Sequence, residues 1–280
     1  MFLVLRNLIV FTFNCFGVGL KLALRSHFIK FLVFFVLVVL VFSGMAAQFS
    51  GRQPATVALD VGFSAIRLLV PLWIVFQVQD LLYREFERRL CLVSISYPVS
   101  RLGWLYSRVC VILFLVVVMQ VFLFAALALE VNLIARWYSQ ATPVALGFHY
   151  WLAVLFQILD VAVLLGIAVF LSVSASTSSF IFLGTLGFML VARSFADVLA
   201  LLVRSPWVVG DVVVESYRDG LGVFFYLLPD LGGLDLRELA LYGEWSFLPR
   251  NIFWVSLSAL CYVGGAMVLA GVVLQRRKIN

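Results

Sequence analysis

Long apolar runs separated by short polar segments dominate the pattern of this chain. Six of the runs can form membrane-spanning helices, because a bilayer core of about 30 Å needs about 20 apolar residues in a helix. The predicted spans are about 28–47, 59–79, 108–130, 150–173, 180–203 and 250–274. No stretch alternates between apolar and polar residues as a barrel strand does. The pattern therefore predicts an all-α integral membrane protein with a single membrane domain over residues 1–280.

Three segments outside the predicted spans differ in character. Residues 1–27 place aromatic and leucine side chains beside Lys21 and Arg25, which is typical of an amphipathic helix lying in the membrane interface. Residues 80–107 gather charge, and residues 204–249 form the longest connection. We therefore expect an interfacial N-terminal helix, a charged connector and one long extracytoplasmic segment.

Composition supports the membrane interpretation and orients the chain. The sequence is 64% hydrophobic and 12% charged, whereas soluble domains are about 25% charged. In alternate connections, twelve Lys and Arg residues fall on one side and five on the other, so the positive-inside rule places both termini and residues 80–107 in the cytoplasm. The net charge of +6 is then a matter of topology rather than of nucleic-acid binding. We expect a multi-pass protein of a cell membrane, with a bacterial inner membrane as the favoured location.

The charge within residues 80–107 follows a helical pattern. Leu82, Phe86 and Leu90 recur at a spacing of four residues and form one apolar stripe, with the charged residues on the other face. Pro98 then interrupts the helix, and Ser100 is suited to cap a second helix that leads into the third span. A solvated connector that only fixes topology fits the same pattern equally well.

Four charged residues fall well inside predicted spans, away from the ends: Arg67, Asp160, Arg193 and Asp197. A charge at the centre of a membrane helix costs about 2.5 to 3.5 kcal/mol, so such residues are usually paired or functional. Arg67, Asp160 and Arg193 lie at similar depths, which allows them to pair. Arg193 and Asp197 are also four residues apart and can pair along their own helix. Both a structural ion-pair network and a role in a substrate path remain open.

Several kinds of chemistry find no support in the pattern. The sequence holds no GxxxxGK[ST] nucleotide loop, and its two histidines and four cysteines lack the spacing of a metal site. No serine or threonine has a catalytic partner at a useful spacing. We therefore expect no catalytic residue, no metal and no cofactor bound by this chain.

Three stretches resemble the permease family of ABC type-2 transporters. They are "EFERRLCLVSISYPVSRLGWLYSRV", which is similar to the cytoplasmic segment of that family, "FTFNCFGVGLKLALRSHF", which is similar to its N-terminal interfacial helix, and "LLPDLGGLDLRELALYG", which is similar to a pattern before its last span. The order and spacing of the three agree over nearly the whole chain. One departure is that Arg89, Leu90 and Cys91 stand where the family often has Gly-Thr-Leu.

The resemblance implies a six-span permease with a cytoplasmic coupling helix. It implies that ATP and Mg bind to separate ABC ATPase subunits, and that a second permease copy, identical or not, completes a dimeric exporter. The coupling segment from Asp80 to Arg101 would dock into the ATPase. The residues implied to contact it are Glu85, Phe86, Glu87, Arg88, Pro98, Ser100 and Arg101.

Two other classes of function compete with the transporter. Some permeases that resemble this chain are linked to maturation of multi-copper enzymes, so a membrane assembly factor that holds a cytosolic partner without transport is the main alternative. An ATP-independent channel or secondary carrier would show inverted repeats or broken midplane helices, and the sequence shows neither.

Overall fold

The computed structural model describes residues 16–21, 28–87, 101–137, 144, 146–175, 177–204 and 228–276. These residues form helices joined by turns, and no strand occurs among them. The helices are α2 (Phe28–Phe49), α3 (Pro54–Val78), the π-helical turn η1 (Gln79–Tyr83), α4 (Arg84–Glu87), α6 (Arg101–Trp137), α7 (Phe148–Ser174), α8 (Ser178–Arg204), α10 (Arg237–Tyr242), the 3-10 turn η3 (Trp245–Phe247) and α11 (Ile252–Arg276).

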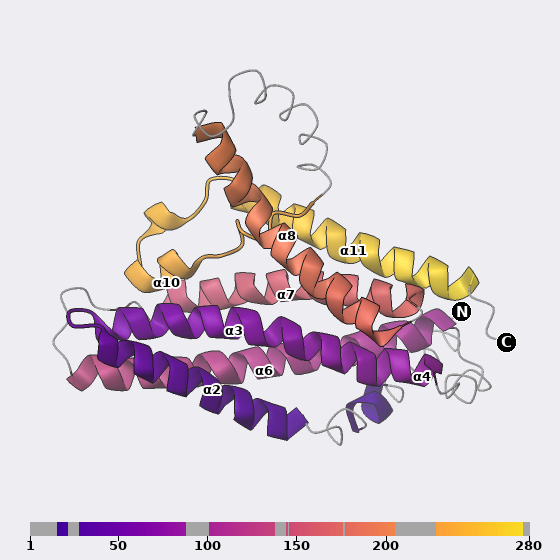
Figure 1. The fold of residues 1–280 in the computed structure, drawn as a ribbon, viewed down its shortest axis with the longest axis horizontal. Helices are drawn as coiled ribbons and strands as arrows, with labels where there is room; N and C mark the ends of the chain where they lie inside the picture. Colours follow the sequence, from indigo (N-terminus) through magenta and orange to yellow (C-terminus); the bar gives the residue numbers. More distant parts are fainter. Residues whose placement is uncertain are drawn as a thin grey trace, which may run out of the picture.

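The long helices run side by side along the longest dimension of the molecule (Figure 1). α2 packs along α3, α3 along α6, and α11 along α7. α8 crosses this group at a slant and contacts α7 and α3. α4, the start of α6 and the end of α11 lie at one end, called the α4 end here, and α10 lies at the other, called the α10 end.

Among the described residues, five helices are long and apolar enough to cross a membrane: Phe28–Phe49, Pro54–Tyr83, Arg101–Trp137, Phe148–Ser174 and Ile252–Arg276. They coincide with the first, second, third, fourth and sixth predicted spans and indicate a multi-pass membrane protein. Most extend beyond the predicted limits, because polar residues at their ends continue the helix outside the apolar run.

The fifth predicted span, 180–203, coincides with α8 but is not confirmed as a span. The apolar stretch of α8 in the described part is Ser178–Ser194, which is shorter than the other five helices. The side chains of α8 beyond Ser194 lie outside the described residues.

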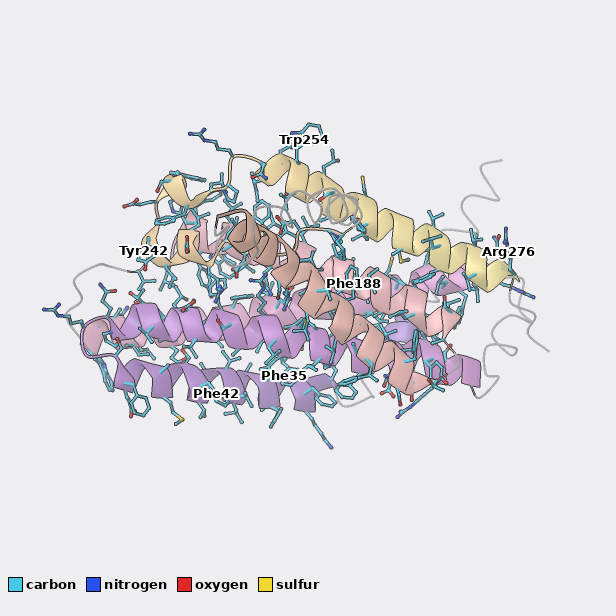
Figure 2. All side chains as sticks on the ribbon, turned by 45° about the horizontal axis from the view of Figure 1, so that its top comes forward. Phe35, Phe42, Phe188, Tyr242, Trp254 and Arg276 are labelled. Atoms are coloured by element: carbon cyan, nitrogen blue, oxygen red, sulfur yellow. The ribbon has the colours of Figure 1, made fainter. Side chains whose placement is uncertain are left out.

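The exterior of the bundle is apolar, as a lipid environment requires. Phe42 on α2 is 59% exposed and Trp254 on α11 is 69% exposed, and both side chains point away from the neighbouring helices (Figure 2). Exposed apolar residues of this size on most long helices cost nothing in hydrocarbon but are unfavourable in water.

Large aromatic side chains fill the interior between α3, α6 and α7. The ring centroid of Phe63 lies 4.8 Å from that of Phe124 and 5.6 Å from that of Tyr150. The Tyr150 hydroxyl donates a hydrogen bond of 2.6 Å to the Phe124 carbonyl oxygen, which satisfies the one polar group of this cluster. Trp73 is also fully buried, further along α3.

The structure describes parts of the three predicted segments outside the spans. Residues 16–21 are helical, as expected within 1–27. α3 continues through η1 into α4, and α6 begins at Arg101 as predicted for the helix after the proline. Arg88, Pro98 and Ser100 lie outside the described residues. Within the predicted segment 204–249, residues 228–249 form a turn-rich stretch with α10 and η3.

Candidate functional site

Two groups of buried charges stand out, one inside the bundle and one at the α4 end. The first, called the intramembrane ion network here, consists of Asp60, Ser64, Arg67, Asp160, Arg193, Asp235 and Arg237. The second is the Glu85–Arg108 pair. Each network is built by helices that are distant in sequence.

Asp160 of α7 and Arg193 of α8 form the deepest ion pair. Arg193 Nη2 lies 2.5 Å from Asp160 Oδ2, and Asp160 is 1% exposed. Arg193 Nη1 donates a hydrogen bond of 2.9 Å to the carbonyl oxygen of Arg67 on α3. One guanidinium therefore links α3, α7 and α8, and the pairing that similar depth allowed is present in the structure.

Arg67 pairs with a residue that the sequence analysis did not consider. Its Nη1 bonds Asp235 Oδ2, and its Nη2 donates a hydrogen bond of 3.0 Å to the Leu231 carbonyl oxygen. Leu231 and Asp235 belong to the stretch before α10, which was predicted to lie outside the spans. That stretch folds back onto α3, and Leu231, Leu234 and Leu236 in it are nearly fully buried.

Arg237 extends the network toward the start of α3. Its Nε donates to Asp235 Oδ2 at 2.8 Å, and its Nη1 lies 2.7 Å from Ser64 Oγ and 3.2 Å from Asp60 Oδ1. With this residue the network holds three arginines and three aspartates. Its formal charges therefore balance, so that the network as a whole carries no net charge into an apolar environment.

Backbone contacts hold the stretch before α10 against α8. The Leu231 amide donates a hydrogen bond of 3.2 Å to the Ala192 carbonyl oxygen. A Cβ at Gly232 would lie 3.0 Å from the Arg193 carbonyl oxygen, so glycine allows this close approach. The Gly233 amide donates to Asp230 Oδ1 at 2.8 Å and closes the turn.

The arrangement favours the structural interpretation of the intramembrane charges. Arg67, Asp160 and Arg193 are each engaged in ion pairs within the network. The Asp197 side chain, the alternative partner of Arg193, lies outside the described residues. Among the residues that the structure describes, no three His, Cys, Asp or Glu side chains form a group able to hold a metal ion.

The Glu85–Arg108 pair joins α4 to the first turns of α6. Arg108 Nη2 lies 2.8 Å from Glu85 Oε1, and the two residues are 7% and 8% exposed. Burial raises the pKa of Glu85, while the Arg108 guanidinium and a hydrogen bond from Trp104 lower it in part. Glu85 therefore faces α6 rather than the cytosol, to which the helical pattern assigned it.

Two further contacts surround this pair. A Cβ at Gly19 would lie 2.8 Å from Arg108 Nη1, so the short helix 16–21 packs directly over the guanidinium. Arg84 pairs with Asp80 one turn earlier, and its side chain is 60% exposed. Arg84 is therefore part of the exposed surface at the α4 end.

The structure describes only some of the other residues implied to contact the ATPase. Phe86 and Glu87 belong to α4, but their side chains lie outside the described residues, as do Arg88, Pro98 and Ser100. Arg101 starts α6. Residues 88–100, between α4 and α6, lie outside the described residues.

No family model matches the chain, and no curated protein matches it.

Proposed function

We propose that this chain is the membrane-spanning permease subunit of an ABC transporter that works as an exporter. Two ATPase subunits hydrolyse ATP with Mg, and a second permease copy completes the complex. The connector between α4 and α6 docks onto the ATPase. Closure of the ATPase pair moves the connector and rearranges the helices of the membrane domain.

The observation that carries this proposal is the buried Glu85–Arg108 pair. It fixes the start of the connector, at α4, to the helix at which the connector ends. A partner that displaces the connector therefore acts on α3 and α6 together, because α4 continues α3 through η1. A connector that only fixed topology would need no such buried contact, whose partners must be desolvated.

The intramembrane ion network supports the same division of roles. It joins α3, α7 and α8 to the stretch before α10. Motion applied at the α4 end of α3 therefore reaches elements at the α10 end through direct contacts.

Co-purification tests the proposal. The tagged chain is extracted from its native membranes in mild detergent, and bound proteins are identified by mass spectrometry. We expect a stoichiometric partner that carries a GxxxxGK[ST] loop. Reversal of two connector charges, Arg88→Glu with Arg89→Glu, should lower the amount of bound partner at least tenfold.

A charge reversal at the other end of α6 is the matched control. Arg136→Glu changes an exposed arginine in the last turn of α6 and should leave the partner bound. Purification of the intact chain without any nucleotide-binding partner would contradict the proposal. A stoichiometric partner that lacks a nucleotide loop would instead favour a membrane assembly factor.

A further inference from the structure

Glu130 of α6 is an acidic residue of a membrane-spanning helix that the intramembrane ion network does not include. It precedes the end of α6 by seven residues, or about 10 Å of helix. Its Oε2 is buried without a hydrogen-bond partner. Its Oε1 lies 3.0 Å from the position that a Cβ would occupy at Gly44 of α2. The carboxyl group is therefore pressed against α2.

No positive charge from the neighbouring helices is available to this carboxyl group. α2 and α11 carry their only charged residues, Lys30 and Arg276, at their α4 ends. On α3, Asp60 is paired with Arg237 and Arg67 with Asp235, and Arg52 in the turn between α2 and α3 is exposed. Arg136 follows six residues later on α6, where it is exposed and lies on a different face of the helix. An ionised carboxylate here would be uncompensated among the described residues.

Two further titratable groups near the α10 end belong to α7 and are engaged elsewhere. The His149 ring packs on Trp245 with centroids 4.7 Å apart. The Tyr150 hydroxyl donates to the Phe124 carbonyl oxygen. Neither group neutralises the carboxyl group of α6.

The hydrogen bond that Ser43 already donates determines whether Ser43 or Glu130 is the donor in a bond between the two residues. Ser43 of α2 is the polar side chain beside the Glu130 carboxyl group. Its hydroxyl already donates a hydrogen bond of 2.8 Å to the Ala58 carbonyl oxygen on α3. A hydroxyl has one hydrogen to donate, so its oxygen can only accept from another group. While Ser43 keeps its bond to Ala58, a bond between Ser43 and Glu130 requires the carboxyl group to carry the proton.

We propose that Glu130 is a proton-binding site inside the membrane domain, occupied at neutral pH by a proton that it donates toward Ser43. The neutral acid fits between α2 and α6. Loss of the proton would place an uncompensated charge against Gly44 and would weaken the packing of α2 on α6. This proposal does not depend on an ATPase partner.

Infrared spectroscopy of the full chain in lipid nanodiscs tests the proposal. A protonated carboxylic acid has a carbonyl stretching band that a carboxylate lacks. We expect this band in the wild type at neutral pH and its loss in Glu130→Gln, which replaces the acid by a neutral group of the same shape. Ser43→Ala should retain the band but shift it, because the acid loses its acceptor.

Asp80→Asn is the matched control, because Asp80 lies at the α4 end in a partly exposed pair with Arg84. It should leave the acid band of the wild type unchanged. Absence of the band from the wild type, or a band of equal intensity in Glu130→Gln, would overturn the proposal.

Labelling with a hydrophobic carbodiimide provides a second test. It uses the wild type and therefore does not require Glu130→Gln to fold. The acid transfers its proton to a carbodiimide nitrogen while its oxygen adds to the central carbon, and acyl migration then gives a stable N-acylurea. We expect the adduct on Glu130 and not on Asp80, with labelling that falls as pH rises. Labelling of Asp80 without labelling of Glu130 would contradict the site.

Discussion

At the scale of single residues, the structure assigns a partner to each charge of the intramembrane ion network. The sequence allowed the Asp160–Arg193 pair, because both residues lie in apolar runs at similar depth. It contained no signal for Asp235, which lies in a segment too polar to be predicted as a span. The sequence did not single out Glu130, because this residue coincides with the end of the predicted third span, where charged residues are common.

Asp235→Asn tests the network at this scale. Asp235 accepts from both Arg67 and Arg237 and is 14% exposed, so loss of its charge leaves the largely buried Arg67 and the partly exposed Arg237 short of a counter-ion. We expect a loss of about 3 kcal/mol in the free energy of unfolding, measured by denaturation in detergent. Ser64→Ala removes an exposed hydrogen bond to Arg237 and should cost at most about 1 kcal/mol. Equal stability of the wild type and Asp235→Asn would contradict the assignment.

At the scale of elements, apolar length predicted five of the helices, and close packing explains how they meet. Gly62 of α3 faces Leu127 of α6, and a Cβ there would lie 2.3 Å from Leu127 Cδ1. The sequence cannot reveal this contact, because glycine is also common in membrane helices for other reasons.

Gly62→Ala should therefore weaken the contact between α3 and α6. Leu127 is fully buried, so it must change rotamer or push the helices apart, at a cost of about 2 kcal/mol. The additional cost should largely disappear in a Leu127→Ala background, which leaves room for the methyl group. Gly264→Ala on α11 is the control, since its Cβ meets no atom within 4 Å. Thermal unfolding in detergent measures all four variants, and equal effects of the two alanine substitutions would refute the packing.

The contact between α4 and α6 makes a prediction with a pH dependence. Arg108→Ala should cost about 3 kcal/mol, because it leaves Glu85 buried without a counter-charge, whereas Glu85→Gln retains an acceptor and should cost about 1 kcal/mol. Because the pKa of Glu85 is raised above its ordinary value of 4.5, the folded chain holds this proton to higher pH than the unfolded chain.

The stability contributed by Glu85 is therefore complete below pH 4.5 and declines as pH rises through the raised pKa. Unfolding measured from that pH upward should show this decline in the wild type and its absence in Glu85→Gln. A contribution that grows with pH over the same range would contradict the burial of the carboxyl group.

At the scale of the whole molecule, composition and apolar length were enough to predict a helical, multi-pass membrane protein. They could not predict that the stretch before α10 packs back onto α3 and α8, because this depends on long-range pairs such as Arg67–Asp235. The pattern of charges predicted the connector. It could not predict the buried Glu85–Arg108 pair, because this pair depends on the packing of α4 against α6.

ATP hydrolysis by the purified complex in lipid nanodiscs tests the proposed function most directly. The account predicts vanadate-sensitive hydrolysis by the co-purified complex, none by this chain alone, and a reduction of at least tenfold with Arg88→Glu and Arg89→Glu but not with Arg136→Glu. Hydrolysis that is equally strong with the reversed connector charges, or a stable complex without any hydrolysis, would contradict it.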